Sequence, residues 1–240
     1  MSMTFPRWAN AIPGALAAVF GLGGGVVTAG VWYYFTPSYW EVGYRPDQPV
    51  DYSHQIHAGK LGMDCRYCHV SVEDSYKANV PDAATCMNCH TGEGETGFLN
   101  NDLWRAHKNN VNLVTLRSSF ASGEPVRWKR IHKLPDYVNF PHSAHVNAGV
   151  SCFSCHGDIN EQKVVAQAES LSMGWCLECH RDPAKALVDV DNLLGEGKVR
   201  VTDLARVSKM LVSKEQQERG AKLAELRQIQ PPDNCGACHY

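Results

Sequence analysis

The 240-residue sequence has no surplus of charge of either sign, no cysteine outside one repeated motif, and no charged residue over a long N-terminal stretch. Lys+Arg 23 against Asp+Glu 25 give a formal net charge of −2. This balance excludes the basic surface of a nucleic-acid-binding domain, so no nucleic-acid partner is expected. Few segments alternate polar and apolar residues, so little β-structure is predicted. The cysteines and the uncharged stretch are therefore the informative features.

All ten cysteines stand in five Cys-x-x-Cys pairs, and each pair is followed directly by a histidine. An even cysteine count can indicate disulfides, and Cys-x-x-Cys can indicate zinc. However, two thiols three positions apart can each add to a haem vinyl group, and the adjacent imidazole can then bind the iron. Because five copies use every cysteine, the sequence favours five covalently attached haems c over disulfides or zinc. The predicted attachment residues are Cys65, Cys68, Cys86, Cys89, Cys152, Cys155, Cys176, Cys179, Cys235 and Cys238, with His69, His90, His156, His180 and His239 as the proximal iron ligands.

The N-terminal segment carries no charge from Trp8 to Trp40, and its apolar part, 12–35, is 24 residues long. About 20 residues suffice to cross a bilayer. Aromatic residues at its C-terminal end are typical of a membrane interface, and the small residues over 21–30 favour packing against another membrane helix. We therefore expect 1–40 to be a single-pass anchor in the cytoplasmic membrane.

A cleaved signal peptide is the alternative, with Thr28-Ala29-Gly30 as a weak cleavage site. Against it, the apolar run exceeds the roughly 7–15 residues of a signal core. Covalent haem attachment takes place outside the cytoplasm. The N-terminus is therefore predicted to be cytoplasmic and the haem-bearing part to lie on the periplasmic or extracytoplasmic side.

The rest of the chain contains an internal duplication. Tyr52-x-His54-x-x-His57 precedes the motif at Cys65, and Phe140-x-His142-x-x-His145 precedes the motif at Cys152. Each is followed by a second motif, 21 and 24 residues further on, whereas the motif at Cys235 stands alone. The predicted organisation is an anchor (1–40), a first dihaem module (41–110), a connecting segment (111–139), a second dihaem module (140–185) and a C-terminal helical segment with the fifth haem (186–240).

The 200 residues after position 40 would have to wrap five haems, so the porphyrins would form much of the core. The predicted fold class is therefore mainly α and irregular, a haem-cored multihaem cytochrome c domain with little β, behind one transmembrane helix. Helices are expected over 202–228, where Ser213 and Gln216 have capping-box spacing, and over 109–121.

Six histidines outside the motifs remain for five irons, and a second axial ligand is the simplest use for each. The candidates for distal iron ligands are His54, His57, His132, His142 and His145, followed by His107, Met173 and Met210. A methionine ligand would raise the potential of its haem relative to a histidine. No residue is predicted to be catalytic.

The aromatic-x-His-x-x-His arrangement before a haem motif resembles small cytochromes of the c3/c7 type. In that group the first histidine ligates the haem that follows and the second ligates another haem. The resemblance implies that His54 serves the haem at Cys65 and His142 the haem at Cys152. It also implies that His57 and His145 reach neighbouring haems, with those at Cys86 and Cys176 as the candidates.

A wider resemblance covers nearly the whole chain. The anchor, the first module, the segment 130–136 (Arg-Ile-His-Lys-Leu-Pro-Asp), the segment 173–180 (Met-Gly-Trp-Cys-Leu-Glu-Cys-His) and the terminal motif are similar to the pentahaem cytochrome subunit of alternative complex III. That complex is a quinol:electron-acceptor oxidoreductase of respiratory or photosynthetic chains. The resemblance implies an iron–sulfur partner related to molybdopterin oxidoreductases, polytopic quinol-binding membrane subunits, a monohaem cytochrome subunit, and a soluble cytochrome c or copper protein as acceptor.

Two other functions remain open at this stage. A catalytic multihaem enzyme would need an open iron position, whereas the spare histidines suffice to close every site. A stand-alone quinol dehydrogenase of the NapC/NirT type, feeding a periplasmic reductase, also has one N-terminal helix followed by haems. The fifth motif and the long segments 91–140 and 181–234 fit that type poorly, so a relay in a quinol-oxidising complex is the leading hypothesis.

Overall fold

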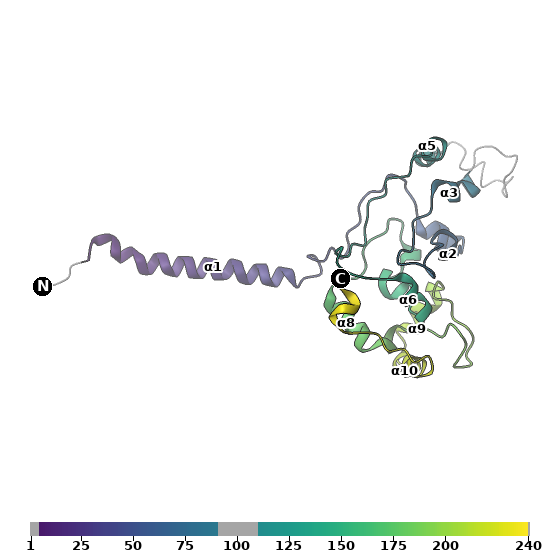
Figure 1. The fold of residues 1–240 in the computed structure, drawn as a ribbon. Coiled ribbons are helices and arrows are strands. Elements are labelled where there is room, and N and C mark those ends of the chain that lie inside the picture. Colours follow the sequence, from purple (N-terminus) through teal and green to yellow (C-terminus); the bar gives the residue numbers. More distant parts are fainter. Residues whose placement is uncertain (1–4, 91–109, 240) are drawn as a thin grey trace. The chain divides into compact units, whose positions relative to one another are not determined.

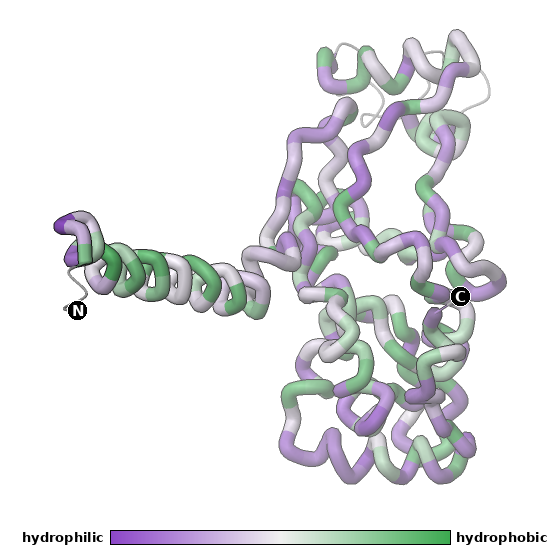
Figure 2. Tube along the Cα trace, turned by 60° about the vertical axis from the view of Figure 1, so that its left-hand side comes forward, coloured by the Kyte–Doolittle hydropathy of each residue, from purple (hydrophilic) through white to green (hydrophobic). Residues whose placement is uncertain are grey.

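A computed structural model describes residues 5–90 and 110–239, in two compact units, 1–42 and 43–240. In the first unit, helix α1 (Ile12–Tyr34) follows a short 3-10 turn (Figure 1). Together, the helical residues Arg7–Tyr34 are long and apolar enough to cross a membrane by length and composition. Hydrophobic residues predominate along this helix (Figure 2). Tyr34 packs against Tyr39 and Trp40, with ring centroids 4.7 and 5.6 Å away.

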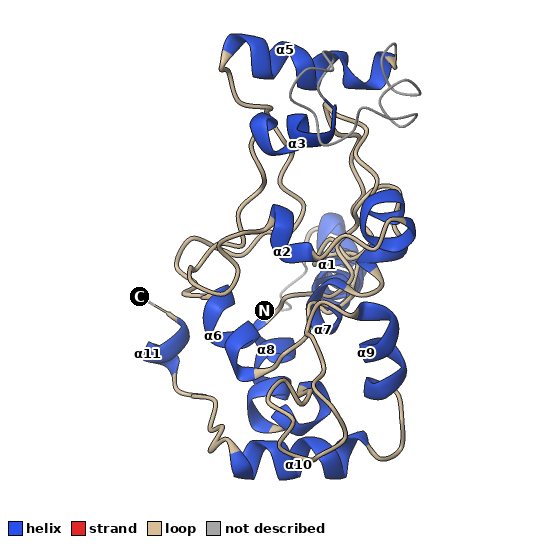
Figure 3. Cartoon of the chain, turned by 90° about the vertical axis from the view of Figure 1, so that its right-hand side faces the viewer, coloured by secondary structure: helices blue, strands red, loops and turns tan. Residues whose placement is uncertain are grey.

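The second unit contains short helices joined by irregular segments (Figure 3). In its described residues there are no strands, only two isolated bridges, Val138 with His239 and Val150 with Leu187. This confirms the predicted fold class. The α-helices are α2 (Cys65–Cys68), α3 (Ala83–His90), α5 (Val114–Ser122), α6 (His142–Ala148), α7 (Phe153–His156), α8 (Met173–Arg181), α9 (Leu204–Leu211), α10 (Gln216–Leu226) and α11 (Cys235–Cys238). The other turns are a π-helix (Gln55–Lys60) and 3-10 helices at Val111–Leu113, Ile159–Glu161 and Pro183–Ala186.

Among the described residues of this unit, buried side chains form two small clusters. Val188, Val199, Val201 and Val207 make one, against which Val146 and Phe153 of the second module pack. Val50 and Met87 of the first module and Leu116 of α5 make the other. The larger cluster joins α9 to α7, so the C-terminal segment supports the second module.

The helical prediction for 202–228 is confirmed, because the segment contains two helices, α9 and α10. The predicted capping box was wrong. The hydroxyl of Ser213 is buried without a hydrogen-bond partner. Gln216 turns inward instead and donates to the carbonyls of Ala184 and Leu187, both at 2.9 Å. Tertiary hydrogen bonds of a buried side chain therefore override the local capping pattern.

The other predicted helix, 109–121, begins later than expected. A 3-10 turn over Val111–Leu113 comes first, and α5 then runs to Ser122. The turn begins where the side chain of Asn110 accepts a hydrogen bond from the backbone of Asn112 at 2.9 Å. Gly123 ends the helix with a φ of 72°, in the left-handed region that glycine adopts readily.

Candidate haem-binding site

Each of the five motifs lies on a short helix, and a polar side chain just before it binds one of the first backbone N–H groups of that helix. In α7 this side chain, Ser151, stands one residue before the N-cap Cys152. Asp64, Ser151 and Asn234 directly precede the first cysteine of their motifs, whereas Asp82 and Ser172 stand four residues before it. Each accepts a hydrogen bond from a backbone N–H two or three residues further on, at 2.7–3.4 Å. Such caps satisfy N–H groups that helix starts leave unpaired. They set each cysteine pair on one helical turn, facing the same side.

Several histidines are held through their Nδ1 atoms by backbone carbonyl oxygens. Among motif histidines, His69 bonds to the carbonyl of Asn79 at 2.5 Å and His180 to that of Pro232 at 2.6 Å. A histidine that donates from Nδ1 presents the lone pair of Nε2 to a metal. Carbonyl partners of this kind orient metal-binding imidazoles in proteins. The same contact is made by His57 with the carbonyl of Ser53 (2.9 Å), His145 with Pro141 (2.8 Å) and His142 with Tyr76 (2.7 Å).

The duplicated aromatic-x-His-x-x-His segments have matching geometry. The second histidine of each pair lies over the aromatic ring, because the centroids of Tyr52 and His57, and those of Phe140 and His145, are both 4.5 Å apart. The first histidine stands edge-on to the same ring. Tyr52 and His54 are 4.8 Å apart at 90°, and the equivalent pair in the second segment is 5.0 Å apart at 80°.

The second histidine of each pair also faces a motif histidine. The ring centroids of His57 and His90 are 6.1 Å apart, and those of His145 and His180 are 6.0 Å apart. Metal–nitrogen bonds of about 2 Å on each side put two imidazoles that share one metal about 6 Å apart, centre to centre. The residues present therefore fit a haem iron held between two histidines at both places.

His54 and His142 are the first histidines of the two pairs, and each lies near enough to a motif histidine, His69 or His156, for the charges to affect one another. Burial, with the nearby charges of His69 and His57, lowers the pKa of His54 to about 4. Its Nδ1 is buried without a partner. Burial lowers the pKa of His156 to about 3, helped by His132 and His142. Neutral imidazoles are the form that binds metals.

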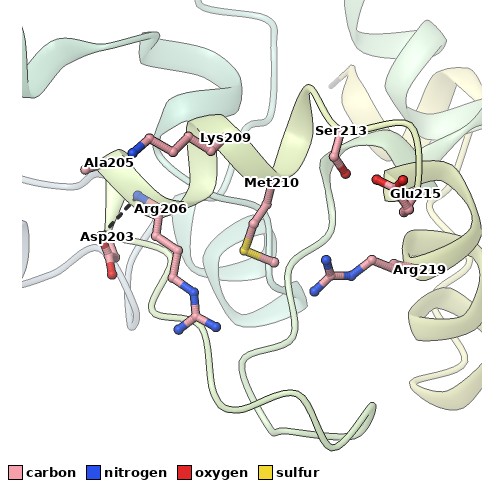
Figure 4. Close-up of a pocket in the computed structure, with 8 residues that line it drawn as sticks. All are labelled: Asp203, Ala205, Arg206, Lys209, Met210, Ser213, Glu215 and Arg219. Atoms are coloured by element: carbon pink, nitrogen blue, oxygen red, sulfur yellow. Dashed lines mark hydrogen bonds between the residues drawn. The ribbon is translucent and has the colours of Figure 1, made fainter.

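The remaining candidates for distal ligands lie in different surroundings. The Nε2 atom of His132 is 3.1 Å from Nδ1 of His156, and the two rings are nearly perpendicular, 4.3 Å apart. Met173 begins α8 and is 65% exposed. Met210 points into a pocket of about 720 Å³ between α9 and α10, and the described residues that line this pocket include no cysteine or histidine (Figure 4). His107 lies outside the described residues.

Burial raises the pKa of several motif thiols, among them Cys68, Cys86 and Cys176. Burial raises the pKa of Cys155 to about 12. Cys65 and Cys152, from different modules, lie close enough for their thiols to interact, and this interaction and burial raise the pKa of Cys152. Sequence reasoning missed this contact because nothing in the spacing relates the two cysteines. It also missed the helix caps, although Asp64 and Asn234 stand directly before their motifs and are residue types that favour the N-cap position.

Comparisons with known proteins agree with these features. Residues 138–240 match the family described as cytochrome c7 and related cytochrome c. The multihaem cytochrome c subunit of menaquinone reductase from Nitratidesulfovibrio vulgaris (strain Hildenborough) is 29% identical over 156 residues, which cover 57% of this chain and 69% of the relative. Together with the Cys-x-x-Cys-His motifs, these matches indicate haem c and support a multihaem c-type cytochrome related to the c3/c7 type.

Proposed function

We propose that this chain binds five haems c and relays electrons between a quinol-linked membrane complex and an extracytoplasmic acceptor. The observation that carries the proposal is the pair of facing imidazoles, His57 with His90 and His145 with His180, about 6 Å apart. When bound, each haem supplies one-electron chemistry of its iron. The polypeptide attaches, orients and encloses the haems and tunes their potentials.

The proposed ligands follow from the motifs and the geometry. His54, His57, His142 and His145 serve as distal ligands of the first, second, third and fourth haems in motif order. The distal ligand of the fifth haem is one of the four remaining candidates, His132, His107, Met173 and Met210. The ten motif cysteines form the thioether bonds and the five motif histidines the proximal ligands.

Two histidines per iron distinguish a relay from a substrate-converting enzyme. A catalytic haem needs an axial position open to its substrate, and a facing imidazole closes that position. The carbonyls of Ser53 and Pro141 hold His57 and His145 in place through Nδ1, which supports permanent ligation. We therefore assign no catalytic residue to the chain, and its enzymatic activity is that of the complex it joins.

The complex we propose resembles alternative complex III. In it, electrons from quinol oxidised by polytopic membrane subunits would pass through an iron–sulfur subunit related to molybdopterin oxidoreductases and enter this chain. They would leave, directly or through a monohaem cytochrome subunit, to a soluble cytochrome c or copper protein. The similarity to a subunit of a menaquinone reductase supports a quinone-linked complex. Helix α1 would anchor the chain by one membrane pass, with its N-terminus in the cytoplasm.

The opposite direction of electron flow, toward the quinone, is favoured by the similarity to a menaquinone reductase subunit. A menaquinone reductase delivers electrons to menaquinone, so the haem chain of such a complex runs toward the membrane. The relay chemistry of this chain would be the same in either direction. The potentials of its haems relative to the quinone couple decide between the two.

Purification from detergent-solubilised membranes tests the proposal. We expect the chain to emerge with iron–sulfur and polytopic membrane subunits, identified by mass spectrometry, and with five haems per chain. Emergence of an intact, monodisperse chain alone would refute membership of a complex and favour a NapC/NirT-like quinol dehydrogenase. Mixing the purified complex with menaquinol or with reduced cytochrome c then gives the direction.

A further inference from the structure

The first and second motifs lie side by side. Asn88, between the two cysteines of the second motif, donates from Nδ2 to the hydroxyl of Tyr67, between the two cysteines of the first motif, at 3.2 Å. The ring of Tyr52 contacts His54 and also His57, whose neighbour is His90 of the second motif. These contacts join α2 to α3 directly.

The first and third motifs are joined by two consecutive residues of the C-terminal segment. Thr202 donates from Oγ1 to the carboxylate of Asp64 at 3.0 Å, and the carbonyl of Val201 accepts from the hydroxyl of Ser151 at 2.6 Å. Asp64 and Ser151 immediately precede Cys65 and Cys152.

The third motif continues to the fourth through α6. His145, on that helix, faces His180 of the fourth motif with ring centroids 6.0 Å apart. The carbonyl of His145 accepts from the backbone N–H of Val150 at 3.0 Å, and Val150 stands two residues before Cys152. One helix therefore reaches both motifs.

The fourth and fifth motifs meet through the segment before α11. The Nδ1 atom of His180 bonds to the carbonyl of Pro232 at 2.6 Å, and Pro232 stands three residues before Cys235. The fifth motif is held in turn by backbone hydrogen bonding between Asn139 and Cys238 at 2.8 Å. The terminal motif is thus seated against the fourth.

These four contacts connect five motifs, and each of the first, third and fourth motifs takes part in two of them. We propose that the chain sets its haem motifs in one unbranched row in the order second, first, third, fourth, fifth. The helices carrying the motifs succeed one another accordingly from α3 through α2 and α7 to α8 (Figure 3). This inference rests on the proposed relay function. It assigns exchange with partner proteins to the second motif at one end and the fifth at the other.

In this row the third motif connects the first and second motifs to the fourth and fifth motifs. An electron that enters at one end oxidises its donor by one equivalent and reduces the acceptor at the other by one. It passes the first–third contact on the way. Removing the third haem therefore separates the second and first haems from the fourth and fifth, whereas removing an end haem leaves the other four connected.

A photosensitiser attached at a single added cysteine tests this connectivity in the holoprotein. All ten native cysteines would be thioether-bonded, so Ala84→Cys and Asp233→Cys each give one labelling site at an exposed residue, two positions before the second and the fifth motif. The readout is the number of haems reduced after light injection, from absorbance and EPR. In the Cys152→Ala/Cys155→Ala background, we expect two haems to be reduced from either label. In the Cys86→Ala/Cys89→Ala control, injection at position 233 should reduce all four remaining haems.

Reduction of three or four haems from one label in the variant without the third haem would overturn the row. If that variant fails to fold, variants that lack the second or the fifth haem test the same order. Magnetic coupling between the first and third haems in the oxidised protein should persist in both of these variants. Its loss in either would overturn the order. Haem content measured beforehand keeps the two proposals apart. Fewer than five haems in the wild type refutes the proposed function, whereas five haems with different connectivity refutes only the row.

Discussion

In the first dihaem module the histidine pair leads into a π-helical turn, Gln55–Lys60, whereas in the second it lies on the regular α-helix α6. The first module has one more residue between its second histidine and its first cysteine, because Cys65 follows His57 by 8 positions and Cys152 follows His145 by 7. A π-turn accommodates one extra residue within a helix. The insertion is absorbed there, and the distances from the second histidine to the aromatic ring and to the motif histidine hardly change.

The modules differ in what supports them. In the second module, Val146 and Phe153 pack against the valine cluster of the C-terminal segment. Nδ1 of His142 bonds to the carbonyl of Tyr76, which belongs to the first module. In the first module, Nδ1 of His54 has no partner, and the adjoining cluster is smaller. The geometry of the histidine pairs is therefore the same in both modules, whereas the packing around them differs.

The largest expected effect comes from removing a distal histidine in either module. His57→Ala or His145→Ala should convert one of the haems to a high-spin state, because the imidazole facing His90 or His180 is lost. EPR of the oxidised protein measures this change. Ile56→Ala, at a half-exposed neighbour, should leave every haem low-spin. If either histidine variant stays fully low-spin with all haems bound, the ligand equivalence of the modules is wrong.

Overpacking beside the second module should have the next largest effect. A methyl group at Gly220 would overlap the carbonyl oxygen of Ala184, which holds α10 against the turn Pro183–Ala186. Gly220→Ala should lower the free energy of unfolding by about 1–3 kcal/mol. Gly174→Ala in α8 is the matched control, since nothing lies within 4 Å of its added methyl. Chemical denaturation of the holoproteins compares them, and equal stability would contradict the packing.

The caps before the first and third motifs should respond differently to acid. Hydrogen bonds from Arg66 hold the pKa of Asp64 well below its usual range. A depressed carboxyl pKa stabilises the fold above the unfolded value of about 3.9, and this stability is lost as the pH falls from there through the folded pKa. The stability difference between wild type and Asp64→Asn should therefore shrink below about pH 4.

Ser151→Ala is the non-titrating counterpart in the other module. Loss of its hydrogen bonds to Val201 and Phe153 should cost about 1 kcal/mol at every pH. Unfolding measured from neutral pH to pH values near 3 distinguishes the two profiles. If the stability of both variants depended on pH in the same way, the ionised carboxylate of Asp64 would not stabilise the fold through Arg66.

The smallest effect is expected where the modules differ by one hydroxyl. Tyr52→Phe makes the first module match the second, whose Phe140 lies at the same 4.5 Å from its histidine. We expect a change in unfolding free energy below about 1 kcal/mol and unchanged low-spin spectra. A larger loss would mean that the Tyr52 hydroxyl, whose pKa is raised by burial, has a structural role of its own.

Local patterns in the sequence predicted what local chemistry determines. The motif spacing indicated covalent haem, the apolar run indicated the α1 helix, and the repeat at Tyr52 and Phe140 indicated two similar modules. Contacts between distant residues could not be read in the same way. Three such contacts depend on tertiary packing, which the spacing of residues in the sequence does not encode. They are the inward orientation of Gln216, the position of His132 beside His156, and the hydrogen bonds of Asp64 and Ser151 to residues 201–202.

The central claim is that this chain is a relay and depends on partner subunits to exchange electrons with quinone. The most direct test adds menaquinol to the purified chain alone and to the complex isolated from membranes, and follows haem reduction by absorbance. The relay account predicts that the haems in the complex exchange electrons with the quinone pool, whereas the isolated chain, with all five haems bound, does not. Rapid reduction of the isolated chain by menaquinol would contradict it.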